Sequence, residues 1–146
     1  NKNNVKLEVI GQIYRLPENV QEHLRKSIQT LSKNNGLTLI MALSYGGRTE
    51  IVDAVRAIGE KVKQGRLDPA DINEQTVSQH LYTRSWPDPD LLIRTSGEMR
   101  VSNFLLWQIS YAELVITPTL WPDFRKPQLC AALEEYARRH RRFGGV

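Results

Sequence analysis

Two arginines separated by a short polar stretch are the residues of this chain best suited to hold an anion. The segment 94-RTSGEMRVSNFLLWQ-108 contains Arg94 and Arg100, with Gly97 between them and Ser102 after them. Guanidinium groups form paired hydrogen bonds with phosphate oxygens and stay charged at any working pH. Ser102 is also a favourable N-cap for a helix over residues 102–110, whose first N–H groups would favour phosphate. The segment predicts a diphosphate cradle made of Arg94, Arg100, Ser102 and nearby backbone N–H groups, although a plain strand-to-helix loop explains the same residues.

A carboxylate follows the cradle at the start of the next apolar segment. Mg²⁺ prefers one or two carboxylates together with substrate phosphate oxygens, and Glu113 could supply one such carboxylate. From its position alone, a surface residue at the beginning of a strand is the favoured interpretation of Glu113.

The elements that must position these residues alternate along the chain. Strands are expected over 5–11, 37–43, 90–95 and 113–117, and helices from Pro17 to the 34–36 turn, from the 44–48 turn to Gly65, and over 73–82, 102–110 and 126–143. This alternation predicts an α/β fold with a mainly parallel sheet, helices on both faces, and a single domain over 1–146. Arg94 then lies at the carboxyl end of a strand, where ligands bind in such sheets.

Two helices are expected to bury an apolar stripe. The stripe of the helix after the 44–48 turn consists of Ile51, Val55, Ile58 and Val62, and that of the last helix of Leu129, Leu133, Tyr136 and Phe143. The two glycines of 44-SYGGR-48 either bring backbone close to a ligand or permit a left-handed turn, and the second interpretation is favoured.

The composition is that of an ordinary globular domain. Of 146 residues, 40% are hydrophobic and 25% charged, and no apolar run approaches the ~20 residues that span a bilayer. The single cysteine, Cys130, excludes an internal disulfide and a cysteine-based zinc site, and fits a reducing compartment. The polar start of the chain is not that of a signal peptide.

A basic excess gives the chain a formal charge of +4, and much of it lies in 138-RRHRR-142. Basic segments favour anionic partners, without selecting among them. This tail has three interpretations: a solvated helix end, a patch for nucleic acid or a membrane surface, or an arm that reaches an anion in a partner subunit.

Several motifs together resemble one family. The run 90-DLLIRTSGEMRVSNFLLWQISYAEL-114, the turn 45-YGGR-48, and the segments 119-TLWPDF-124 and 141-RRFGG-145 resemble the cis-prenyltransferases, above all the bacterial undecaprenyl diphosphate synthases. The resemblance covers nearly the whole chain, in the right order. The chain lacks the DDxxD motif that trans-prenyltransferases use to hold Mg²⁺.

This resemblance implies a reaction and roles for particular residues. Such enzymes use Mg²⁺ to condense isopentenyl diphosphate units onto an allylic diphosphate, usually farnesyl diphosphate, with cis geometry, and so make a long polyprenyl diphosphate lipid carrier for the cell wall. By position, Arg94, Arg100 and Ser102 would hold the isopentenyl diphosphate, and Glu113 would be a magnesium ligand. In the tail, Arg142 and Gly144 match an RxG element that crosses the dimer interface to the partner's diphosphate. The resemblance thus favours the third interpretation of the tail, a homodimer, a cytoplasmic location with peripheral membrane contact for product release, and no nucleic-acid partner.

Two family elements are absent from the sequence. They are a first strand and loop of the type HxxxDGNxRWA, whose Asp is the catalytic carboxylate, and a later element of the type FSxENWxR. The chain is therefore expected to be the C-terminal three-fifths of such a domain, without its N-terminal strand and helices, and inactive alone. The alternative is a non-catalytic partner subunit or inactive fragment. Met99 stands where some members have His, and Ser44 where Asn is usual.

Overall fold

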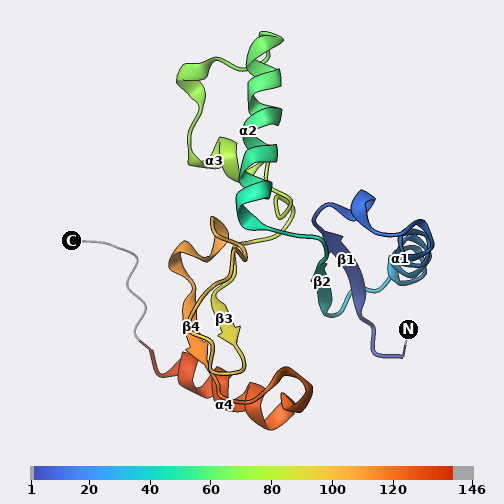
Figure 1. Cartoon of the computed structure of the whole chain (residues 1–146), viewed down its shortest axis with the longest axis vertical. Helices are drawn as coiled ribbons and strands as arrows, with labels where there is room; N and C mark the ends of the chain where they lie inside the picture. The colour runs from blue at the N-terminus through green and yellow to red at the C-terminus, as the bar shows by residue number, and fades with distance from the viewer. Residues whose placement is uncertain (1, 140–146) are drawn as a thin grey trace. The chain divides into compact units, whose positions relative to one another are not determined.

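The chain divides into two compact units. In a computed structural model that describes residues 2–139, the first unit is Asn1–Ser85 and the second is Trp86–Val146 (Figure 1). Each unit is described by itself below. The expectation of a single domain over 1–146 stays a prediction.

The first unit is built on a parallel strand pair joined by a helix. β1 (Lys6–Ile10) and β2 (Thr38–Ala42) pair in register from Lys6 opposite Thr38 to Ile10 opposite Ala42. The connection between them contains α1 (Glu18–Leu31), which packs on β1 as a parallel crossover requires. α2 (Gly47–Lys63) and the short α3 (Glu74–Ser78) follow and contact each other.

Two left-handed residues shape the turns at the carboxyl ends of β1 and β2. Gly11 has φ +109°, and a Cβ at this position would lie 2.1 Å from the carbonyl oxygen of Leu43. Ser44 has φ +47°, whereas Gly46 has φ −156° and Gly47 is buried at the start of α2. The predicted left-handed turn is therefore present, but a serine adopts it and the two glycines do not. Gly65 ends the α2 region with φ +66°, as predicted.

The buried face of α2 differs from the predicted stripe. The buried residues are Gly47, Glu50, Ala54 and Ile58, and Val55 is 58% exposed. The prediction was wrong about Val55 because a carboxylate, Glu50, occupies the inward-facing position one turn before Ala54.

The second unit contains the other parallel pair. β3 (Leu91–Arg94) and β4 (Glu113–Ile116) pair from Leu91 opposite Glu113 to Arg94 opposite Ile116. α4 (Lys126–Ala137) packs on β4 and buries Ala132. Leu129 and Leu133, predicted to face inward, are 41% and 48% exposed. The helix was predicted to extend to residue 143, but α4 ends at Ala137; the segment with Phe143 lies outside the described residues.

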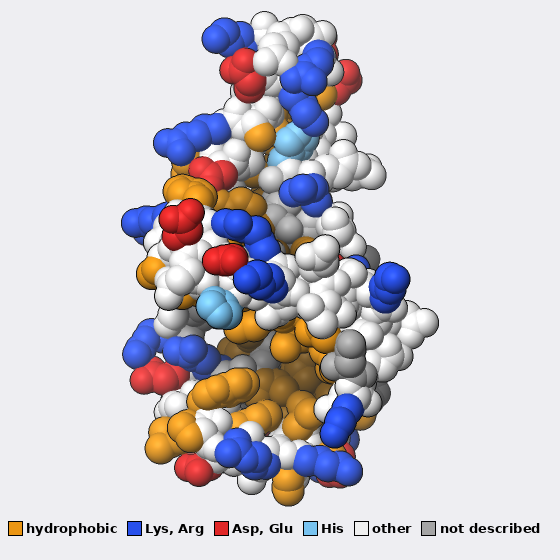
Figure 2. Space-filling model, turned by 90° about the vertical axis from the view of Figure 1, so that its right-hand side faces the viewer, with side chains coloured by type: hydrophobic (Ala, Val, Ile, Leu, Met, Phe, Trp, Pro, Cys, Tyr) orange, Lys and Arg blue, Asp and Glu red, His pale blue; other side chains and the backbone are white. Residues whose placement is uncertain are grey.

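Both strand pairs are parallel and helices pack on them, so the predicted α/β class is confirmed. Among residues 2–139, no helix is long and apolar enough to cross a bilayer. Exposed hydrophobic side chains nevertheless lie among the charged ones on the face drawn in Figure 2.

Candidate functional site

The candidate site begins at the end of β3. The apolar run 91-LLI-93 forms the strand, and Arg94 is its last residue, at the carboxyl end of the pair. The following loop is tied to the chain beyond β4. The Ser96 N–H donates to the Thr119 carbonyl and the Gly97 N–H to the Thr117 carbonyl, each at 2.9 Å. The loop after Arg94 is thus held by hydrogen bonds to a segment some twenty residues further along the chain.

Arg94 carries unsatisfied hydrogen-bonding capacity. Its Nη2 donates to the Ser102 hydroxyl at 3.5 Å, the long limit for such a bond. Its Nε is buried and finds no partner among the described residues. A buried donor without an acceptor costs free energy, and an anion bound here would remove that cost.

Arg100 is occupied by a neighbouring acid. Its Nη1 lies 2.5 Å from Glu98 Oε2, and the two side chains are 71% and 37% exposed. The structure thus brings Arg94 and Ser102 together, while Arg100 is paired with a carboxylate on the same loop.

The predicted helix over residues 102–110 is absent, and Ser102 is not an N-cap. Ser102, Asn103 and Leu105 have φ of +49°, +61° and +45°, and within the described residues 102–112 the regular structure is a single 3₁₀ turn at Gln108–Tyr111. Residues with positive φ cannot propagate a right-handed helix. The expected helix N-terminus therefore contributes nothing to the site, and that prediction was wrong.

Glu113 lies at the other end of the strand pair from Arg94. It is opposite Leu91, whereas Arg94 is opposite Ile116, three residues further on. At ~3.3 Å per residue, this separates Glu113 from Arg94 by about 10 Å along the sheet. The register therefore does not place Glu113 directly beside the cradle of the same chain.

The Glu113 carboxylate is bound by an arginine of the tail region. Its Oε2 accepts from Arg139 Nη1 at 2.8 Å, and Arg139 Nη2 also donates to Glu135 of α4. These hydrogen bonds, that to Glu113 foremost, raise the pKa of the Arg139 guanidinium. Arg139 is not among the site residues predicted from the sequence, although the spacing of Glu135 and Arg139 is that of a helical ion pair.

These residues could bind Mg²⁺ only together with oxygen atoms of a substrate. Residues 2–139 contain no cluster of three or more acidic, histidine or cysteine side chains that could hold a metal ion. Glu113 offers one carboxylate, of which Oε2 is paired with Arg139. A single carboxylate suits Mg²⁺ where a diphosphate supplies the other oxygens. The remaining predicted site residues, Arg142 and Gly144, lie outside the described residues.

A second polar cluster lies in the first unit. Glu50, 1% exposed, accepts from the Tyr45 hydroxyl and from the Tyr82 N–H. Asp53 accepts from the Tyr82 hydroxyl and from Gln12 at 3.2 Å. Burial and the Asp53 hydrogen bond raise the pKa of Tyr82 to about 12, and the Tyr82 hydrogen bond lowers that of Asp53. This network ties α2 to the segment after α3, which is a structural role.

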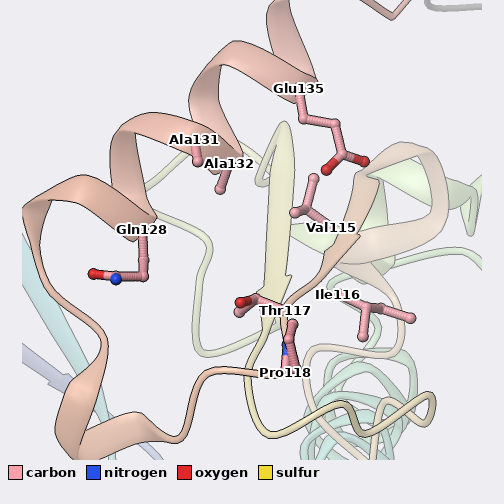
Figure 3. Close-up of a pocket in the computed structure, with 8 residues that line it drawn as sticks. All are labelled: Val115, Ile116, Thr117, Pro118, Gln128, Ala131, Ala132 and Glu135. Atoms are coloured by element: carbon pink, nitrogen blue, oxygen red, sulfur yellow. The ribbon is translucent and has the colours of Figure 1, made fainter.

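One cavity lies between β4 and α4 (Figure 3). It has a volume of about 190 Å³ and is lined by Val115, Ile116, Thr117, Pro118, Gln128, Ala131, Ala132 and Glu135. Its charged group is a carboxylate, and none of the cradle residues lines it. This cavity is therefore not the anion site.

Comparison with known proteins agrees with the resemblance in the sequence. The family described as "Putative undecaprenyl diphosphate synthase" matches residues 1–144. The isoprenyl transferase of Porphyromonas gingivalis is 54% identical over 142 residues, which are 97% of this chain and 56% of that protein. The Bacillus subtilis isoprenyl transferase is 49% identical over 143 residues, which are 98% and 55% of the two chains. The chain thus spans just over half the length of these relatives.

Solved structures give the same result for the fold. Lavandulyl diphosphate synthase from Lavandula x intermedia, in complex with dimethylallyl diphosphate, matches with a TM-score of 0.96 and 43% identity, over 99% of this chain and 62% of that one. A probable undecaprenyl diphosphate synthase from Campylobacter jejuni matches with a TM-score of 0.85 and 36% identity, over 99% and 65%. The α/β fold is therefore that of cis-prenyltransferases, and the chain belongs to the undecaprenyl diphosphate synthase family.

Proposed function

We propose that this chain is the isopentenyl diphosphate-binding part of a cis-prenyltransferase that makes a long polyprenyl diphosphate lipid carrier. The observation that carries the proposal is Arg94 at the carboxyl end of β3, with a buried Nε that lacks an acceptor among the described residues. A diphosphate oxygen would supply that acceptor. Membership of the family supports the reaction class.

The reaction joins isopentenyl diphosphate to an allylic, farnesyl-type diphosphate. The allylic C–O bond breaks and its electron pair leaves with the diphosphate. The isopentenyl double bond then forms the new C–C bond, and a proton is lost to give a cis double bond. In this chain Arg94, Arg100 and Ser102 bind and orient the isopentenyl diphosphate. For Arg100 to take part, its pair with Glu98 must open or be shared.

Glu113 would hold Mg²⁺, which supplies charge neutralisation at the diphosphate. Because Glu113 and Arg94 lie at opposite ends of the strand pair, we assign Glu113 to the diphosphate of a second copy. The tail residues Arg142 and Gly144 would reach the same diphosphate. This arrangement implies a homodimer, consistent with the interpretation of the tail as an arm toward a partner.

The 146-residue chain is not expected to be catalytic alone, because it contains neither the DGN nor the ENW element of the family. The second candidate is a non-catalytic partner subunit or inactive fragment, which would bind diphosphate without turnover. For the whole protein we propose a cytoplasmic location with contact to the membrane surface, where the lipid product is released, and no nucleic-acid partner.

Calorimetric titration with isopentenyl diphosphate, with and without Mg²⁺, tests this function. Arg94→Ala should weaken binding about tenfold or more, because charge-assisted hydrogen bonds contribute ~1.5–3 kcal/mol. Arg25→Ala, which removes an exposed arginine of α1, is the matched control and should bind like the parent. Equal affinity of Arg94→Ala and the parent would refute the cradle. Salt-steep binding of duplex DNA at physiological ionic strength would instead favour a nucleic-acid function.

A further inference from the structure

Arg139 joins two carboxylates from different elements. Nη1 reaches Glu113 at the amino end of β4, and Nη2 reaches Glu135 on α4. The Arg139 and Glu113 side chains are 32% and 25% exposed, so this pair is more shielded from water than a surface pair. It therefore fixes the end of α4 against the start of β4.

Its position just beyond the helix agrees with this role. Arg139 lies two residues after Ala137, the last residue of α4, and from the turn that follows the helix it contacts both Glu135 and Glu113. The neighbouring Arg138 points elsewhere: it pairs with Glu134 at 3.8 Å, and both side chains are largely exposed, at 80% and 69%. Two adjacent arginines thus differ in environment while sharing charge and sequence context.

We propose that Arg139 is a positioning residue of the diphosphate site. It orients the Glu113 carboxylate through Oε2 and leaves Oε1 to face a metal-bound diphosphate. Arg139 donates to this carboxylate at 2.8 Å. This inference rests on the proposed function.

The test compares adjacent arginines by calorimetric titration of the full chain with isopentenyl diphosphate and Mg²⁺. Arg139→Gln should lower the affinity about fivefold to tenfold, and Arg138→Gln should stay within about twofold of the parent, as expected for an exposed pair. Arg139→Lys keeps the positive charge but loses the two guanidinium nitrogens that bind separate carboxylates, and should recover part of the lost affinity. Thermal melts would establish that each variant is folded at the titration temperature.

A double-mutant cycle separates positioning from stability. If Arg139 acts through Glu113, Arg139→Gln should cause little further loss of affinity in a Glu113→Gln background. Equal affinity of Arg139→Gln and the parent, or fully additive losses, would overturn the inference. Loss of binding in Arg94→Ala but not in Arg139→Gln would overturn only this inference. A parent chain that does not bind would overturn the proposed function and this inference together.

Discussion

Glu98 Oε2 lies 2.5 Å from Arg100 Nη1, so a carboxylate occupies one of the two guanidinium groups of the predicted cradle. An incoming diphosphate must compete with Glu98 for Arg100. The local net charge of the loop is correspondingly less positive than its arginines alone indicate.

Removal of the Glu98 charge should therefore strengthen diphosphate binding. We expect Glu98→Gln to raise the affinity for isopentenyl diphosphate about fivefold, because an exposed charge near the ligand contributes ~1 kcal/mol. Calorimetric titration measures the change. Glu22→Gln, which breaks the exposed pair with Lys26 on α1, is the control and should leave the affinity unchanged. A lower affinity in Glu98→Gln would mean that Glu98 orients Arg100 for the ligand.

The left-handed conformation of Ser44 predicts a stabilising substitution. Gly adopts φ of +47° without steric cost, and Asn tolerates it better than Ser. Ser44→Gly and Ser44→Asn should raise the free energy of unfolding by about 0.5–1 kcal/mol, as measured by urea denaturation. Ser32→Gly, at φ −63°, is the control and should destabilise the chain. Destabilisation by both Ser44 substitutions would show that a contact of the Ser44 hydroxyl stabilises the fold by more than its left-handed backbone conformation costs.

Gly11 should tolerate no side chain. Gly11→Ala would place a Cβ 2.1 Å from the Leu43 carbonyl oxygen at φ +109°, and we expect a loss of more than about 2 kcal/mol in the free energy of unfolding. Gly59→Ala is the matched substitution, because no atom lies within 4 Å of its Cβ position and the residue is helical. It should stabilise the chain by up to ~1 kcal/mol. Similar effects of the two substitutions in denaturation would contradict the described turn.

Tyr82 should make stability depend on alkaline pH. Its pKa is raised from 10.0 to about 12 in the folded chain, so the unfolded chain loses this proton first as the pH rises. The contribution of Tyr82 is thus complete below pH 10 and is lost between pH 10 and 12. Urea denaturation across this range should reveal a decline in the parent that is smaller in Tyr82→Phe. Tyr14→Phe, at a position 73% exposed, should retain the decline of the parent.

The sequence correctly predicted structural features that depend on residues close together in the chain. The apolar run before Arg94 correctly placed this residue at a strand end, and Gly65 correctly ended a helix. The helix expected after Ser102 failed because serine and asparagine readily leave the right-handed region. The hydrogen bonds from Ser96 and Gly97 to Thr119 and Thr117 join distant segments, and no local pattern reveals them.

The apolar stripe predicted for α2 was partly wrong because a charged residue, Glu50, is buried on this helix. Periodicity counts apolar residues, so it passed over Glu50 and selected Val55 instead. Glu50 is buried because Tyr45 and Tyr82 donate hydrogen bonds to it, and Tyr82 is 32 residues away in the chain. Likewise, Arg139 is one of several basic residues in a row, and only the folded structure shows that it contacts Glu113.

The left-handed residues of the cradle loop make it a site of easy local opening. Ser96, Ser102, Asn103 and Leu105 all have positive φ, and for non-glycine residues such conformations cost of order 1–3 kcal/mol each. Segments that store strain and lack regular hydrogen bonding exchange their amide hydrogens faster than the strands beside them. The amides of residues 98–105 should therefore exchange ahead of those of β3 and β4, whereas the amides of Ser96 and Gly97, which donate to Thr119 and Thr117, should be protected. A bound diphosphate would slow that exchange, so that the ligand itself completes the folding of this part of the chain.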